Sequence, residues 1–225
     1  MKKIALLQSN YIPWKGYFDI IKSVDIFVIY DDVQFTKNDW RNRNQIITKE
    51  GLSWITIPVK HNFLNQKISE TYTVNDIWKK KHINTLTVNY GRAPFFKTYK
   101  EELFYLYSIC DNNLSNINFL FIKYICKCLD INTEIIYSKD LDLVGNRSEK
   151  IIDACIKLGA TSYFTGPSAN NYLDSSLFEN NNVSVEWMDY SRYLPYKQLS
   201  NDFTHFVSIL DLLFMEGPNS IKYLL

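Results

Sequence analysis

The sequence of 225 residues predicts an α/β fold, a Rossmann-like parallel sheet that begins with a βαβ unit. Two short continuous apolar runs, Ile4–Leu7 and Ile26–Tyr30, are typical of strands that are buried on both faces. A helical pattern at about Tyr17–Val24 lies between them. Strand, helix and strand in so few residues form a compact βαβ unit, and its two strands must run parallel.

The rest of the chain predicts an inserted β-hairpin, a helical middle region and further strands. Two alternating runs within residues 44–59 flank Lys49-Glu50-Gly51, which places a glycine at the turn. Residues 75–129 show the helical period. Because no linker or repeat interrupts the chain, we expect one domain over residues 1–225. The expected helices are 75–89, 95–109, 116–129, 146–158 (opened by the Asn146-x-x-Glu149 capping box) and 207–215, and the later strands are 135–137, 162–165 and 183–187.

Composition excludes several functional classes. The formal net charge is +1, so bulk electrostatics favour neither a nucleic-acid coat nor binding to an anionic membrane. The first apolar run is shorter than the roughly 7–15 residues of a signal peptide, and no run approaches the roughly 18 that span a bilayer. We therefore expect a soluble, cytoplasmic protein. The four cysteines form no CxxC pair and have no nearby metal-ligand spacing, so we expect reduced thiols and no metal site.

Three polar segments follow predicted strands. They are residues 8–17, 31–44 and 165–174. Ligands of open parallel sheets bind in the crevice beyond the carboxyl ends of the strands. The sequence therefore predicts a binding site where these segments meet.

The first segment, QSNYIPWKGY, combines hydrogen-bonding and stacking side chains. Gln8 and Asn10 offer hydrogen bonds, and Tyr11, Trp14 and Tyr17 offer flat rings. The start of the following helix presents unpaired N–H groups that favour an anion. The alternative is a polar turn with aromatic side chains packed beneath it.

The second segment contains an acidic pair and an arginine pair. Asp31 and Asp32 are adjacent on an extended chain and point in opposite directions, so one is expected to face the crevice. Arg41 and Arg43 suit a diphosphate or carboxylate, which they would hold bidentately, and Trp40 suits stacking on a ring. The alternative is an arginine pair that bridges nearby carboxylates on a solvated hairpin.

A general base is harder to locate. His82 lies four residues after Trp78 on a predicted helix, and its ordinary pKa suits proton transfer near neutral pH. A half-buried structural histidine is the alternative. Common hydrolase, protease, Walker and dinucleotide motifs are absent from the sequence. The candidate base residues are His82 and Asp31, and the candidate binding residues are Gln8, Asn10, Tyr11, Trp14, Lys15, Tyr17, Asp32, Gln34, Trp40, Arg41, Asn42, Arg43, Gly166, Pro167 and Tyr172.

The chain resembles the WbqC-like family of bacterial proteins. The resemblance rests on QSNYIPWKGYFDII (8–21), DDVQFTKNDWRNRN (31–44) and GLSWITIPV (51–59), and it continues in order to the segment 195–217. Members are associated with O-antigen and other surface polysaccharide gene clusters. The resemblance implies attachment of an amino acid such as glycine, or of a small acyl group, to the amine of a nucleotide-linked dideoxyamino sugar. The donor and any cofactor stay open.

In that hypothesis His82 or Asp31 deprotonates the sugar amine, and Arg41, Arg43 and Lys15 hold the diphosphate. Two other functions stay open. The first βαβ unit is similar in plan to nucleotidylyltransferases such as pantothenate synthetase, which suggests an ATP-dependent amide ligase. However, Trp14-Lys15-Gly16-Tyr17 stands where those enzymes have an HxGH motif, and the aromatic side chains supply no cation. The other alternative is a sugar-nucleotide binding protein without catalysis.

Overall fold

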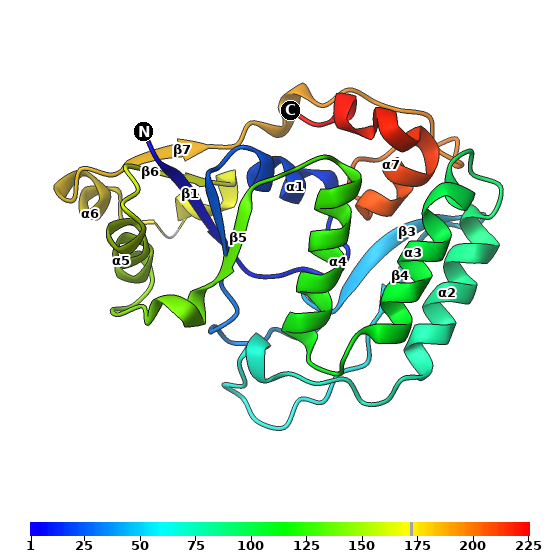
Figure 1. Cartoon of the computed structure of the whole chain (residues 1–225), viewed down its shortest axis with the longest axis horizontal. Coiled ribbons are helices and arrows are strands. Elements are labelled where there is room, and N and C mark those ends of the chain that lie inside the picture. The colour runs from blue at the N-terminus through cyan, green and yellow to red at the C-terminus, as the bar shows by residue number, and fades with distance from the viewer. Residues whose placement is uncertain (172) are drawn as a thin grey trace.

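The computed structural model, which describes residues 1–171 and 173–225, has a parallel sheet between two layers of helices (Figure 1). The sheet order is β5-β2-β1-β6-β7, and every neighbouring pair is parallel. This confirms the predicted Rossmann-like α/β fold and its opening βαβ unit. The strands of this sheet are β1 (Lys3–Leu7), β2 (Ile26–Ile29), β5 (Glu134–Tyr137), β6 (Ser162–Thr165) and β7 (Ser184–Trp187).

Alternating side chains of the strands supply two separate cores. Ile4 and Leu6 of β1 point to one face of the sheet, and Ala5 between them points to the other. Helices α5 (Ser148–Leu158) and α6 (Ser175–Asn180) cover the first face. Helices α1 (Lys15–Lys22) and α4 (Leu114–Cys128) cover the second face (Figure 1). Burial on both faces explains why the strands read as continuous apolar runs.

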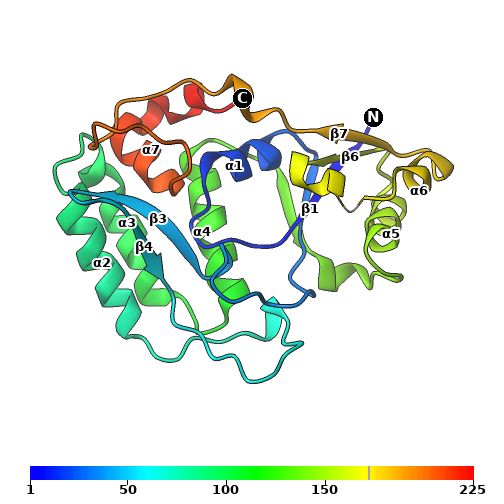
Figure 2. The same ribbon diagram turned by 180° about the vertical axis from the view of Figure 1, so that it is seen from behind.

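The predicted hairpin is confirmed. Strands β3 (Arg43–Thr48) and β4 (Gly51–Thr56) pair antiparallel, with Thr48 opposite Gly51. Gly51 has a φ of 103°, a conformation that glycine adopts without a steric penalty. The hairpin lies beside α2 (Ile77–Tyr90), α3 (Phe96–Ile109) and α7 (Ile209–Glu216), and all four contribute to the larger core (Figure 2).

Several element boundaries differ from the sequence prediction. Helix α1 begins at Lys15 rather than near Tyr17, because Trp14 already has the extended backbone of an N-cap. Helix α6 was not predicted, and it is short. The capping box is half formed: the Asn146 amide donates to the Glu149 carboxylate at 2.9 Å, but Arg147 is the N-cap of α5.

The order of the strands reverses direction at β1, which has β2 on one side and β6 on the other. From β1 the chain proceeds to β2, on the side away from β6. The loops that follow β1 and β6 therefore diverge, and a crevice opens between them at the carboxyl edge. Some residues of each predicted segment, 8–17, 31–44 and 165–174, line a cavity at this crevice, namely Gln8, Asn10, Trp14, Tyr17, Trp40, Arg41 and residues 165–169. No helix in the described residues has the length and apolar character needed to cross a bilayer.

Candidate functional site

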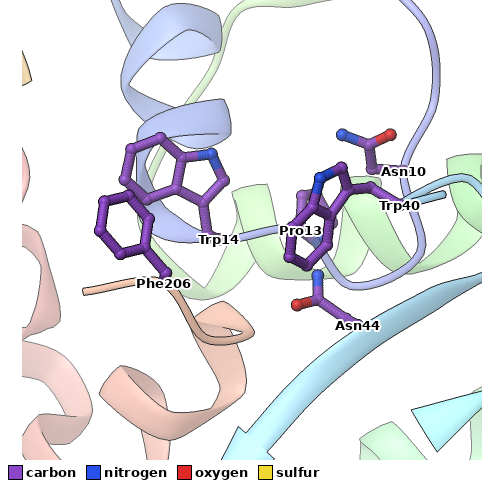
Figure 3. A pocket seen from close by; sticks show the side chains of 6 residues that line it. All are labelled: Asn10, Pro13, Trp14, Trp40, Asn44 and Phe206. Atoms are coloured by element: carbon purple, nitrogen blue, oxygen red, sulfur yellow. The ribbon is translucent and has the colours of Figure 1, made fainter. Parts of the chain in front are cut away.

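Three adjoining cavities lie at the crevice. The Arg41 cavity, about 270 Å³, lies between the loop after β1 and the segment after β6, and it is lined by Gln8, Arg41 and Gly166 among others. The tryptophan cavity, about 230 Å³, shares Asn10, Trp14 and Trp40 with it and adds Pro13, Asn44 and Phe206 (Figure 3). The Arg147 cavity, about 550 Å³, shares Leu7 and Gln8 with the Arg41 cavity and extends to Arg147.

Arg41 is held in place by the loop after β1. Its guanidinium donates to the side-chain oxygens of Gln8 and Asn10, and its backbone carbonyl accepts from Asn118 Nδ2 at 2.8 Å. Asp39 lies 3.8 Å from the guanidinium and forms a partly exposed ion pair. The structure therefore brings together three residues that were predicted from two segments of the sequence.

Aromatic rings form much of the wall of the tryptophan cavity and of the adjoining part of the Arg41 cavity. Trp14 lies 4.8 Å from Tyr190 and 5.6 Å from Phe206 between ring centroids. Trp40, with 38% of its surface exposed, lies across the tryptophan cavity near Pro13 (Figure 3). Both predicted tryptophans therefore present ring surface to the same cavity.

The segment after β6 closes the Arg41 cavity. Gly166 and Pro167 line it, and a Cβ at Gly166 would lie 3.2 Å from the Tyr190 hydroxyl. Gly166 thus packs closely against Tyr190, and its φ is not positive. Tyr17 also lines the cavity, and its hydroxyl donates to the Gln8 carbonyl at 3.1 Å. Tyr172, another predicted residue, lies outside the described residues.

His82 lies elsewhere, in the buried core beneath the hairpin. It is 2% exposed, and its Nε2 lies 3.1 Å from the Thr56 carbonyl, which can only accept. Nε2 therefore carries the proton, and Nδ1 accepts from the Tyr11 hydroxyl at 2.9 Å. Burial lowers the pKa of His82 to about 4. With both nitrogens bonded inside the core, His82 is a structural histidine, and the assignment as general base is withdrawn.

Tyr11 shares that buried position. Its side chain is fully buried, and its hydroxyl also lies 2.6 Å from the Tyr107 hydroxyl. Trp78 packs edge-on against its ring at 6.2 Å. Stacking of Tyr11 on a ligand is therefore replaced by packing within the core.

Asp31 joins three segments of the chain. One carboxylate oxygen accepts from the Ser9 amide at 2.8 Å, and the other accepts from the hydroxyls of Ser9, at 2.7 Å, and Ser115. Burial raises the pKa of Asp31, and these donors lower it. Asp31 and Asp32 line a separate polar cavity of about 230 Å³ at the ends of β2 and β5, where Asp32 accepts from the Ser138 hydroxyl at 2.7 Å. Asp31 therefore connects the loop after β1 to α4.

The predicted arginine clamp does not form, because Arg43 is engaged with Trp54 and Asn38 and lines none of the crevice cavities. Its guanidinium lies 4.0 Å from the centre of the Trp54 ring and donates to the Asn38 carbonyl. Only Arg41 of the pair contributes to the crevice.

Three other predicted residues are engaged outside the cavities. Lys15 is 2% exposed, its Nζ lies 3.9 Å from the centre of the Tyr193 ring, and burial lowers its pKa to about 8. The ammonium donates to the Tyr223 carbonyl at 3.2 Å, and Lys15 lines none of the three cavities. The amide side chains of the other two donate to backbone carbonyls, Asn42 to Ile57 at 2.8 Å and Gln34 to Leu64 at 2.6 Å.

The lining residues that were missed from the sequence include Tyr190, Arg147, Asn44 and Phe206. Tyr190 follows the carboxyl end of β7, and Arg147 follows β5 after a 3₁₀ turn, so the strand-end rule that found the other segments applied to both. Asn44 was assigned only to the hairpin, and its Nδ2 donates to the Tyr11 and Ile12 carbonyls. Phe206 comes from a long connection with no local signal.

Comparison with known proteins identifies relatives over nearly the whole chain. The model of the WbqC-like protein family matches residues 8–223. A relative named "Uncharacterized protein Rv1507c", from Mycobacterium tuberculosis, is 45% identical over 226 residues, which cover 100% of this chain and 98% of the relative. No solved structure matches the chain. Apart from Leu6 and Leu7 of β1, the residues that line the three cavities lie within the matched range, and the chain belongs to the WbqC-like protein family.

Proposed function

We propose that the chain binds a nucleotide-linked dideoxyamino sugar in the strand-end cavities and transfers an amino acid or small acyl group to its amine. The proposal places the chain in surface polysaccharide biosynthesis. The observation that supports it most directly is Arg41, which lines a cavity with aromatic walls at the crevice of a Rossmann-like sheet.

The charges at the crevice favour an anionic ligand. Among the described residues, those that line the three cavities include Arg41 and Arg147 and no aspartate or glutamate. Arginine binds phosphate oxygens through paired N–H donors, and the low dielectric of a cavity strengthens the attraction. A diphosphate beside Arg41 fits this distribution of charge.

The aromatic walls favour a ring-bearing ligand. Trp14 and Trp40 present flat apolar surface to the tryptophan cavity, and Asn10 and Asn44 add amide groups at its margin (Figure 3). Flat rings of this kind pack against the apolar face of a sugar or against a nucleobase. A nucleotide sugar contains a sugar, a nucleobase and the diphosphate that Arg41 would bind.

In the transfer step, the amine nitrogen attacks the carbonyl carbon of an activated acyl donor. The new C–N bond forms as the bond to the activating group breaks, and the nitrogen loses one proton. Because His82 and Asp31 are held in structural hydrogen bonds, the proposal assigns to the protein the binding and orientation of the two reactants, and solvent takes the proton.

A second candidate function is a sugar-nucleotide binding protein without catalysis. It is favoured by the absence of an imidazole or carboxylate from the described residues that line the three cavities. Both candidates predict binding of the same ligand class, and only the first predicts a product.

Titration calorimetry on a matched pair of variants tests the shared claim. Arg41→Ala is expected to weaken affinity for a nucleotide-linked aminohexose by about 10- to 150-fold, the scale of a hydrogen bond to a charged group. Arg43→Ala removes a neighbouring arginine that stacks on Trp54, and it is expected to leave affinity within about twofold. Equal losses in the two variants would contradict the assignment of Arg41.

Mass spectrometry separates the two candidates. Wild-type protein is incubated with a panel of nucleotide-linked dideoxyaminohexoses and activated donors, including acyl phosphates, acyl thioesters and amino acids with ATP. The transferase predicts an amide whose formation falls with Arg41→Ala. Binding without any amide across the panel would favour the second candidate.

A further inference from the structure

We infer that the ligand lies across Gln8, with its nucleoside in the Arg147 cavity and its sugar in the tryptophan cavity, and that Arg147 is a second phosphate-binding side chain. This inference rests on the proposed function and gives the orientation of the ligand and a further recognition residue.

The Arg147 cavity is larger than the tryptophan cavity, just as the nucleoside of a nucleotide sugar is larger than its sugar. The Arg147 cavity, at about 550 Å³, falls within the range of about 300–1,000 Å³ for small-molecule sites, whereas the tryptophan cavity is about 230 Å³. Val33, Ile151 and the Tyr30 and Tyr163 rings give the larger cavity apolar and aromatic walls. The larger cavity therefore suits the bulkier nucleoside.

Gln8 connects the two ends. It lines both the Arg41 cavity and the Arg147 cavity, and the Arg41 cavity in turn shares Asn10, Trp14 and Trp40 with the tryptophan cavity. The Gln8 side-chain oxygen accepts from the Arg41 guanidinium, so this position is adjacent to a cation. A diphosphate that crosses there would have Arg41 on one side and Arg147 on the other.

Arg147 reaches the crevice from the opposite face of the sheet. It is the N-cap of α5, the helix that packs on the face away from α1. Its φ of 46° is uncommon for a residue with a side chain, and outliers of this kind are concentrated at binding sites. Because Arg147 is positively charged and lines the cavity, it is the second candidate, beside Arg41, to bind the diphosphate. Its unusual backbone φ agrees with a role in binding.

The test compares UDP, GDP and dTDP with the corresponding hexose-linked nucleotides by titration calorimetry. Arg147→Gln, which keeps a long polar side chain, is expected to weaken binding of the nucleoside diphosphate and of its hexose-linked form by a similar factor of at least tenfold. Trp40→Ala is expected to weaken only the hexose-linked form. Arg147→Lys should retain most of the affinity, because it keeps the charge.

Lys150→Gln is the matched control, since Lys150 is a cation of α5 that does not line the cavity. It should bind both ligands like wild type, and melting temperatures of all variants report whether they fold. Weaker binding of bare diphosphate by Trp40→Ala, with an Arg147→Gln effect confined to hexose-linked ligand, would establish the reverse orientation and overturn the inference. Unchanged binding in Arg147→Gln would also overturn it. If wild type binds none of these nucleotides, the proposed function fails first.

Discussion

At the scale of single residues, burial determines which polar side chains take part in the site. His82 and Asp31 are each 2% exposed, and each has its polar atoms bonded to neighbouring segments of the protein. Arg41 belongs to the same part of the chain and lines the Arg41 cavity, with 16% of its side chain exposed. Asp31 also lines a cavity, the polar one beside Asp32, but both of its carboxylate oxygens accept hydrogen bonds from the protein. A buried polar group loses its hydration and requires protein partners, whereas a group at a cavity can exchange its partners for a ligand. The chemistry of the crevice is therefore that of its arginines, amides and aromatic rings.

His82 is expected to affect stability rather than ligand affinity. Its folded pKa of about 4 lies below the ordinary value of 6.5, so between these pH values the unfolded chain binds more protons. The contribution of neutral His82 is complete above pH 6.5 and is lost as the pH falls toward 4, by roughly 3 kcal/mol in total. Urea unfolding at pH 4.5, 5.5 and 7.5 measures this change.

His82→Asn should flatten that pH dependence. It should also lower the free energy of unfolding at pH 7.5 by about 1–3 kcal/mol, because the Tyr11 hydroxyl and the Thr56 carbonyl lose their partner. Calorimetry should give wild-type affinity for the nucleotide sugar. An unchanged pH profile in the variant would show that His82 does not titrate in this way.

At the scale of elements, glycines end two helices with a positive φ but in different surroundings. Gly159 follows α5 with a φ of 64°, and an added Cβ would have no atom within 4 Å. Gly217 follows α7 with a φ of 56°, and its Cβ would lie 2.4 Å from the Phe95 ring, which lies next to the start of α3. The first glycine serves only the helix end, and the second also allows α7 and α3 to approach.

This contrast predicts unequal costs for the same substitution. Gly159→Ala should lower the free energy of unfolding by about 1–2 kcal/mol, the cost of a left-handed conformation for a residue with a Cβ. Gly217→Ala should cost more than that, because the Phe95 ring must also move. Chemical denaturation of both variants measures the difference. Equal losses would mean that α7 and α3 separate without penalty.

At the scale of the whole molecule, the crevice is assembled from segments that are far apart in the sequence. Side chains from segments 7–20, 40–44 and 165–169, together with Tyr190 and Phe206, line the Arg41 and tryptophan cavities, and Arg147 lines the adjoining Arg147 cavity from the other face of the sheet. The strand order places β1 and β6 next to each other, so the loops that follow them border the same crevice, and the segment before the hairpin supplies Trp40 and Arg41. The site therefore depends on the complete fold.

Ligand binding is expected to protect these distant segments together. With a saturating nucleotide sugar, amide hydrogen exchange should slow in segments 8–14, 147–151 and 166–171, because the ligand contacts all three and opposes their opening. The hairpin turn at 49–51 lies away from the cavities and should exchange at its free rate. Protection confined to the polar cavity of Asp32 and Ser138 would place the ligand elsewhere.

Much of the fold could be predicted from the sequence, because strands buried on both faces produce unmistakable apolar runs. The direction in which individual side chains point could not be predicted from the sequence. Arg41 and Arg43 are two residues apart, which on a strand would place them on one side, but β3 begins only at Arg43 and a turn precedes it. His82 shares a helix face with Trp78 as predicted, and the sequence does not specify that this face packs beneath the hairpin.

The hydrogen bonds around Asp31 have a consequence for the thermodynamics of recognition. Ser9 is fixed by Asp31, and Asn118 donates both to the Ser9 hydroxyl, at 2.9 Å, and to the Arg41 carbonyl. The loop after β1 therefore acquires its binding conformation when the protein folds. Ordering one residue costs about 1–2 kcal/mol of conformational entropy, and a loop that is already rigid does not incur that loss on association. The crevice is preorganised on this side, so binding a ligand there would cost little conformational entropy in the loop after β1.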